Sequence, residues 1–490
     1  MVTFNQVPSS TRVPFVFVEI DPSRASSGPA IQEYRAALIG QKLPTTPQAA
    51  NVPLLATSAD QVGQAYGSGS ILHGMAVAWF KANKATEAWF VGVEDAGGAT
   101  KGTKTLTVTG PATAAGSVFL YVAGRRITAA VASGDTANTI AASINSAIAA
   151  SEFAAELPMT AGVATNVVTL TARNGGTQGN AIDVRLNFQT GEALPAGVAI
   201  VVATGVTGAT DPTLGTAVAS LGARQYHVLA VGLNDATSVG VVDAELATRF
   251  GPSVQQEGHA FYGKAETHAN LVTFGDGLNS KHTTVVGMKA PLSPPWELGS
   301  SVAGIVAFYG QADPARPFKT LELPGIVGPA LADRFTLLER DLLLKNGIAT
   351  AVVDDAGVTR AERLITTWQV NATGAADVSF LDVTTLLTLS YLRFDFRTRF
   401  QTTFPRHKLA DDGTRYGAGQ PVVTPKTAKA FAATVFRGWE GLGLVEGFDQ
   451  FLADLVVERN AQDRNRLDIV LPPDLVNQLQ VAGVSLQFLL

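Results

Sequence analysis

Histidine is the side chain that most often transfers protons or holds a metal ion near neutral pH, and this sequence contains six. A helical zinc pair needs two histidines four residues apart, so that both imidazoles lie on one helix face. No two histidines here have that spacing, so we interpret each as a surface or core residue rather than a metal ligand. The six are His73, His227, His259, His268, His282 and His407.

Two pairs of adjacent acids could in principle perform general acid–base chemistry. One pair lies in Asp354–Gly357 and the other in Asp411–Gly413. Acidic residues just before a glycine are typical of turns, because their carboxylates bond the local backbone and glycine supplies the positive φ. We therefore predict that both pairs form turns.

The glycine-rich loops that would cradle a phosphate group are incomplete. Segment Gly97–Thr103 lacks the G-x-x-x-x-G-K-[ST] order, and Gly67–Gly69 lacks the third glycine of a dinucleotide loop. The absence of cysteine excludes disulfides, thiolate catalysis, iron–sulfur clusters and cysteine-bound zinc. We predict no catalytic residue, no cofactor and no metal. A nucleotide-binding enzyme with a β insert is the alternative from another class.

One basic stretch alternates with phenylalanines, a pattern that can bind single-stranded nucleic acid. Basic residues near a helix C-terminus are also favoured by the helix dipole, and phenylalanines three or four residues apart are typical of a helix core. We favour this structural interpretation; a third is that the cations meet an acidic neighbouring protein. The cations are Arg393, Arg397, Arg399, Arg406 and Lys408, and the rings are Phe394, Phe396, Phe400 and Phe404.

Composition limits the classes of protein that would position these residues. The 490 residues are 46% apolar and only 16% charged, against about 25% charged in an ordinary soluble domain. A net charge of -5 gives no basic field for nucleic acid. No apolar run approaches the ~18 residues of a membrane span, and no signal peptide is recognisable, so we expect assembly in a cytoplasm.

Strands and helices alternate in two separate stretches of the sequence. A buried strand at 35–40, a helix at 71–81 and a strand at 87–93 form the first, and the alternation resumes at 211. This pattern predicts a multidomain α/β fold: an α/β sandwich core with crossover helices. The predicted boundaries are an N-terminal arm (1–24), a first core segment (25–96), an inserted domain (97–210), a second core segment (211–375), a C-terminal α+β domain (376–481) and a C-terminal strand arm (482–490).

The inserted segment differs in composition from its surroundings. It is rich in Thr, Ala, Gly and Val, which predicts a small β-rich domain set into a surface loop. Within it, Asp135 or Thr136 caps a predicted helix whose Ile140, Ile144 and Ile148 share one face.

The C-terminal third mixes predicted helices and strands. One helix is expected to bury Leu331, Phe335, Leu338 and Leu342 on a single face. A long helix spans 383–402, and another opens with Pro425 in its first turn. Strands follow at 452–458 and 467–470, then a short helix at 473–479 and a last strand at 484–490.

Both ends of the chain are apolar strands, which soluble monomers avoid because such edges aggregate. We predict that these arms donate strands to neighbouring subunits, head to tail, giving a ring or a helical array. The alternative is that both strands pair within their own subunit. The arm residues are Phe15, Val16, Phe17, Val18 and Ile20, with Val484, Leu486, Phe488 and Leu490.

Several C-terminal segments make the sequence similar to a known family. They are Arg406–Thr414, Gly419–Pro425, Gly443–Glu446, Val457–Asp468 and Leu471–Leu479. Through these segments the chain closely resembles the tail sheath proteins of contractile-tailed bacteriophages, of the Mu-like type. Ala123–Arg126, Ser133–Thr136 and Gly179–Asn180 resemble that group's extra domain.

The resemblance implies a structural role in the virion, without enzymatic activity. Family members form hexameric rings stacked helically around a tail tube, and their contraction drives the tube through the host cell envelope. The implied partners are further copies of the chain, the tube protein, and baseplate and tail terminator proteins. A phage-tail-like bacteriocin or injection particle would use a similar sheath. The subtilisin likeness noted for the family's α/β domain implies no protease here, because no Gly-Thr-Ser motif occurs.

The resemblance also assigns roles to particular residues. The arms would complete a sheet in the C-terminal domain of a neighbouring subunit. The tube would be contacted by the same domain, with Arg393, Arg397, Arg399, Arg406 and Lys408 as candidates. The receiving strands would contain Leu455, Val457, Leu467 and Ile469.

Overall fold

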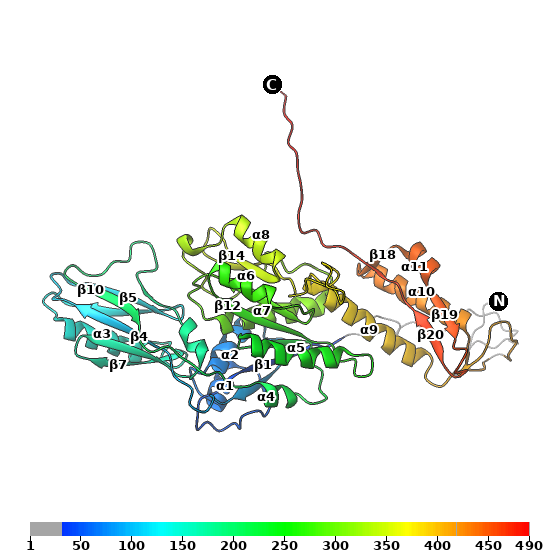
Figure 1. The fold of residues 1–490 in the computed structure, drawn as a ribbon, viewed down its shortest axis with the longest axis horizontal. Coiled ribbons are helices and arrows are strands. Elements are labelled where there is room, and N and C mark those ends of the chain that lie inside the picture. The colour runs from blue at the N-terminus through cyan, green and yellow to red at the C-terminus, as the bar shows by residue number, and fades with distance from the viewer. Residues whose placement is uncertain (1–31, 418, 490) are drawn as a thin grey trace, which may run out of the picture. The chain divides into compact units, whose positions relative to one another are not determined.

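The computed structural model describes residues 32–417 and 419–489 of the chain (Figure 1). These residues form two compact units. The larger contains Glu33–Ser390 and the C-terminal residues from Leu475 onward, and the smaller contains Tyr391–Asp474. In the described residues no helix is long and apolar enough to cross a membrane.

An eight-stranded sheet forms the centre of the larger unit, in the order β15-β14-β13-β12-β11-β1-β3-β2. The inner pairings from β14 to β3 are all parallel, and the edge strands β15 and β2 are antiparallel. The predicted α/β core is therefore confirmed. Its strands are β1 (Arg35–Gln41), β2 (Leu54–Ala56), β3 (Glu87–Val93), β11 (Val228–Val231), β12 (His259–Ala265), β13 (Thr283–Met288), β14 (Ile348–Val353) and β15 (Thr359–Arg363).

Helices cover both faces of this sheet, so the strands are apolar on both sides. In β1, Ala36 and Leu38 belong to one buried cluster, whereas Ala37 and Ile39 belong to the other. The first face carries α1 (Ala59–Tyr66), α2 (Ile71–Ala82) and α7 (Pro295–Ala312). The second carries α4 (Gly215–Ala219), α5 (Ala236–Phe250), α6 (His268–Asp276) and α8 (Leu337–Lys345).

Helix α7 lies very close to the sheet because two glycines allow it. A Cβ on Gly263 would stand 2.1 Å from the Pro295 carbonyl oxygen, and one on Gly299 would stand 2.8 Å from the Gly263 nitrogen. Both distances are too short for any real side chain, so glycine is required at this crossing. The helix also packs along α2.

The insert between β3 and β11 contains two small sheets and one helix. The sheet orders are β10-β4-β8-β7 and β6-β5-β9. Thr136 caps α3, and Ile140, Ile144 and Ile148 are buried along it, as predicted. The elements are β4 (Thr103–Thr109), β5 (Gly116–Val122), β6 (Arg125–Val131), α3 (Ala137–Ala150), β7 (Met159–Ala164), β8 (Val167–Ala172), a 3-10 turn η2 (Thr177–Ala181), β9 (Val184–Leu186) and β10 (Ala199–Thr204).

The predicted helical face of Leu331, Phe335, Leu338 and Leu342 is wrong. Leu331 lies in a separate 3-10 turn, η3 (Leu331–Asp333), because Thr336 and Glu339 form a capping box that starts α8 at Leu337. Leu338 is 78% exposed and Leu342 is 44% exposed. The buried residue of α8 is instead Leu343, which packs in the cluster beneath β14.

The smaller unit is built around α10 (Pro425–Gly441), which begins with Thr424 as N-cap and Pro425 in its first turn, as predicted. Two secondary-structure predictions in this region are wrong. Leu452–Asp454 end a helix rather than open a strand, and no helix forms over the predicted 473–479, where Asp474–Leu475 are a short strand instead. The remaining elements are α9 (Val383–Thr403), β16 (Lys408–Leu409), β17 (Val422–Val423), β18 (Val445–Glu446), α11 (Phe448–Asp454), β19 (Val456–Arg459), β20 (Leu467–Val470) and β21 (Asp474–Leu475).

Candidate assembly interface

The C-terminal arm, described over residues 482–489, has the pattern of a strand but pairs with no strand in the described chain. Val484, Leu486 and Phe488 alternate with Ser485 and Gln487, so the apolar side chains share one face of an extended segment. Their exposed fractions are 87%, 89% and 76%. Figure 1 draws this end as an extended stretch outside any helix or strand. A strand at 484–490 therefore stays a prediction for the assembled state.

The N-terminal arm cannot be placed in the same way. Phe15, Val16, Phe17, Val18 and Ile20 lie outside the described residues, as does Leu490.

The predicted receiving strands are brought together as an antiparallel hairpin, β19 with β20. Val457 pairs with Ile469, and Arg459 pairs with Leu467. Val457 and Ile469 are half-buried, and β19 contacts α10. The predicted Leu455 is buried (2% exposed) but caps α11 just before β19 begins.

Each hairpin strand has an open edge. Within the described residues β19 pairs only with β20, so the outer backbone groups of both strands have no ladder partner. Val456 and Val470 are paired with each other and are 48% and 58% exposed. Unpaired edges beside exposed β-branched side chains are a template for a further strand.

The turn of the hairpin is held by one asparagine. The Asn460 side-chain oxygen accepts hydrogen bonds from the backbone N–H groups of Gln462 (2.8 Å) and Asp463 (2.9 Å). Its side-chain nitrogen donates to Asp468 in β20 (2.6 Å). These bonds fix the strand register before any neighbour arrives.

Asp411 ties the hairpin to the rest of the smaller unit. Its Oδ2 forms ion pairs with Arg459 (3.2 Å) and with Arg464. Desolvation opposes ionisation of this carboxyl group, but bonds from Arg459 and the charge of Arg464 outweigh it and hold the pKa of Asp411 below its ordinary value. The local sequence predicts only a turn at Asp411 and does not reveal these ion pairs.

The basic residues of α9 and the loop after it differ in their surroundings. The Arg399 Nε–H group donates to Oδ1 of the fully buried Asp395 (2.9 Å) and lies 2.8 Å from its Oδ2. Oδ2 also accepts a hydrogen bond from the Trp439 indole N–H (2.7 Å). Arg393 and Arg397 are half-buried, whereas Arg406 and Lys408 are exposed. Phe396, Phe400 and Phe404 each contact the ring of Phe431, which supports the core interpretation of these phenylalanines.

Comparison with known proteins identifies relatives over the whole length of the chain. The model of the phage tail sheath protein central domain matches residues 207–367, and the model of the phage tail sheath C-terminal domain matches residues 375–488. Over 490 residues, all of both chains, the sequence is 36% identical to the Mu-like prophage FluMu tail sheath protein of Haemophilus influenzae.

The chain belongs to the phage tail sheath family. It is a structural protein of contractile tails, a component of the virion. Solved structures show the same fold at low sequence identity. The sheath tail protein of Listeria innocua is 13% identical with a TM-score of 0.50, over 93% of this chain and 95% of that chain. The sheath of an extracellular contractile injection system, in its contracted state, is 8% identical with a TM-score of 0.51, over 98% of both chains.

Proposed function

We propose that this sheath protein polymerises by strand donation into a contractile cylinder around a tail tube. The observation that carries the proposal is the C-terminal arm, whose alternating apolar residues are exposed while the β19–β20 hairpin has open edges. Inserting the arm of one subunit beside the hairpin of the next would satisfy the backbone groups of both. It would also bury Val484, Leu486 and Phe488, each contributing on the order of 1.5–3 kcal/mol.

A donor and an acceptor on different surfaces make the contact head to tail, which produces rings or open helical polymers. Hexameric rings stacked helically, with the N-terminal arm Phe15–Ile20 as a second donor, would give the sheath of a phage tail. Such a subunit would also contact baseplate and tail terminator proteins. Contraction would need no nucleotide, because a lattice assembled in a high-energy packing can relax to one with more buried interface.

The tube-facing surface belongs to the same proposal. Arg393, Arg397, Arg399, Arg406 and Lys408 were the candidates from sequence. Arg406 and Lys408 are the exposed ones, so we propose that they contact the tube, while Arg399 is engaged with Asp395. A bacteriocin or injection particle remains the second setting for the same sheath, since one structural match is an injection-system sheath.

Deleting residues 484–490 tests the arm directly. The expected product is a folded subunit, with an unchanged circular dichroism spectrum, that forms no tubular polymers in negative-stain electron microscopy. A matched pair of point variants refines the test: Leu486→Glu places a charge on the apolar face, and Gln487→Glu places it on the other face. Loss of polymers in the first variant alone is expected. Tubes formed by the deletion variant would contradict the proposal.

A further inference from the structure

The sheet of the larger unit has a crevice in which proteins of this topology bind ligands. Strand order runs outward from β1 to β3 in one direction and from β1 to β11, β12, β13 and β14 in the other. In such doubly wound sheets the ligand lies at the carboxyl ends of the strands, where the order reverses. Here that end carries Gln41, the last residue of β1, with Lys42 directly after it, and Asn234 after β11.

The insert fills this crevice with its own backbone and side chains. The Gln41 amide donates to the Gly175 carbonyl oxygen (2.7 Å), and the Asn174 amide donates to the Lys42 carbonyl oxygen (2.8 Å). Asp95, which follows β3, accepts from the Gly175 N–H (2.6 Å) and from Asn174 (2.9 Å). Asn174 is 5% exposed, so these bonds are shielded from water and from competing partners.

A buried ion pair makes the second connection. Arg125, at the start of β6 in the insert, bonds Glu297 in the first turn of α7 (2.7 Å), and their side chains are 8% and 3% exposed. Arg125 also lies 3.7 Å from Glu156 of the insert. The region where the insert meets the α/β core is called the joint below. The apolar core continues across this joint, because Val122 and Ile127 of the insert share one buried cluster with the core residue Trp296.

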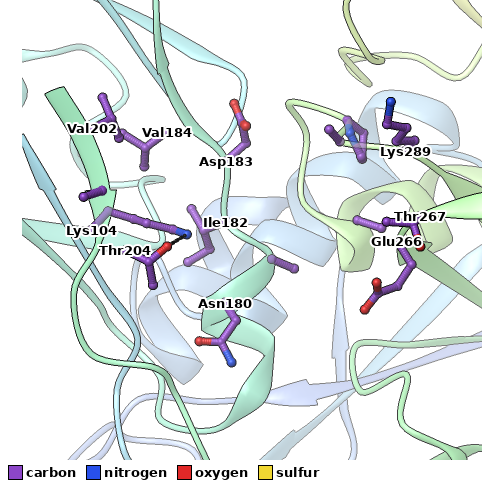
Figure 2. Close-up of a pocket in the computed structure, with 15 residues that line it drawn as sticks. Lys104, Asn180, Ile182, Asp183, Val184, Val202, Thr204, Glu266, Thr267 and Lys289 are labelled. Atoms are coloured by element: carbon purple, nitrogen blue, oxygen red, sulfur yellow. Dashed lines mark hydrogen bonds between the residues drawn. The ribbon is translucent and has the colours of Figure 1, made fainter. Parts of the chain in front are cut away.

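The other side of the joint is open. A cleft of about 540 Å³ lies here, lined by Lys104 and Asp183 of the insert and by Glu266 and Lys289 of the core. Figure 2 shows these side chains on either side of it. Each charge finds a partner on its own side. Lys104 bonds Thr204 (3.0 Å) and Asp183 bonds Arg185 (2.6 Å), while Glu266 bonds Asn270 (2.9 Å) and Lys289 bonds Asp333 (3.0 Å). The four charges therefore form no ion pair across the cleft, and Arg185 of the insert reaches the core through one hydrogen bond, to the carbonyl oxygen of Ala290 (3.2 Å). A hinge movement at the joint would narrow the cleft here.

We propose that the insert and the α/β core form one rigid body, with Asn174 in the crevice and Glu297 on α7 as the residues that keep the cleft from closing. In this arrangement a segment of the insert occupies the crevice in which other proteins of this topology bind a ligand. If the proposed contraction takes place, the insert and the core move together. The proposal concerns the single subunit and stands whether or not the arm model is correct.

The test measures the distance across the joint in the full chain. Because the chain has no cysteine, Lys84→Cys and Ala142→Cys place one spin label on the core and one on the insert, both at exposed positions. Lys84→Cys with Ala247→Cys places both labels on the core as a control. Diluting labelled chains into unlabelled protein isolates distances within one subunit, whatever its state of assembly, in pulsed electron–electron double resonance.

The expected result is a single distance across the joint, with the same width as the control pair. The double variant Asn174→Ala and Glu297→Gln should widen the joint distribution and leave the control pair narrow, which also shows that the core remains folded. A broad or double distribution in the unaltered protein would overturn the rigid body. An unchanged width in the double variant would overturn the assignment of Asn174 and Glu297.

Discussion

A buried carboxylate in the smaller unit shows how single residues fix its helices. Asp395 is fully buried on α9 and receives bonds from Arg399 and from Trp439 on α10. A buried charge is tolerated only when it is paired and hydrogen-bonded, and removing one partner leaves the others uncompensated. The pair therefore sets the contact between the two helices.

We predict that Asp395→Ala lowers the free energy of unfolding by about 3–5 kcal/mol, since it leaves the guanidinium of Arg399 and the indole N–H of Trp439 without their bonding partner. Chemical denaturation monitored by tryptophan fluorescence measures the loss. Asp341→Ala is the control, because Asp341 pairs with Lys345 on the surface, with side chains 54% and 69% exposed. That change should cost less than about 1 kcal/mol. Equal losses in the two variants would contradict the role of Asp395.

Two buried histidines, His227 and His259, should make the free energy of unfolding depend on pH. Burial, with the charge of Arg35 adding to it, lowers the pKa of His227 to about 4, and burial beside His282 lowers that of His259 to about 3. Both are neutral in the fold, whereas in the unfolded chain they take up a proton near pH 6.5. The unfolded state then binds more protons, so stability falls as pH drops from about 6.5 toward 4.

Each histidine should steepen this fall by up to about 1.4 kcal/mol per pH unit below pH 6.5. Thermal unfolding between pH 7.5 and 4.5 measures the slope. His227→Gln removes one of the two groups with a lowered pKa and should flatten the curve. A curve unchanged by His227→Gln would refute the assignment.

At the scale of single residues, the sequence predicted what depends on local spacing. A spacing of three or four residues between phenylalanines predicts core positions, and Phe396, Phe400 and Phe404 do pack on Phe431. Asp411 was not recognised, because its partners Arg459 and Arg464 lie 48 or more residues away and no local pattern links them. The charged side chains of the hairpin turn were the available signal.

At the scale of elements, α8 shows how a cap overrides apolar periodicity. Leu343→Ala should cost about 2–5 kcal/mol, because Leu343 is fully buried beneath β14. Leu338→Ala, five residues earlier on the same helix and 78% exposed, should stay within about 0.5 kcal/mol. Urea denaturation of the two variants measures both values. A large loss in the free energy of unfolding for Leu338→Ala would mean that Leu338 is buried, as the sequence predicted.

Elements with strong local signals were predicted well and others were not. The helices α3 and α10 have caps, and α3 has a clear apolar stripe, so their existence follows from sequence. Segment 452–454 is as apolar as a strand, but it closes a short helix against α10, a tertiary contact that overrides propensity. Residues 476–489 belong to no helix or strand, and the proposed strand donation accounts for this by a stabilising partner in another chain.

At the scale of the whole molecule, composition agrees with a subunit covered by its own copies. A charged content of 16% and a net charge of -5 keep the repulsion between copies of the chain small. The absence of cysteine leaves no thiols that could cross-link neighbouring copies. Both features suit repeated contacts between identical chains.

Head-to-tail donation makes a prediction that no symmetric contact shares. A chain without residues 484–490 keeps its hairpin and can accept an arm, whereas a chain with Val457→Pro and Ile469→Pro keeps its arm but loses backbone donors of the hairpin. Each variant alone should remain monomeric. Mixed, they should form a one-to-one complex and stop there, because the accepting chain has no arm to pass on.

Sedimentation velocity of the mixture, followed by negative-stain microscopy, distinguishes these outcomes. Adding the arm-deleted chain to the unaltered protein should shorten the cylinders as its fraction rises. Each arm-deleted chain can accept an arm but cannot donate one to the next subunit, so growth stops there. The variant Gln487→Glu, added at the same fractions, should leave the length unchanged. Full-length cylinders from the two complementary variants would show that arms are not passed from subunit to subunit, and the head-to-tail model would fail.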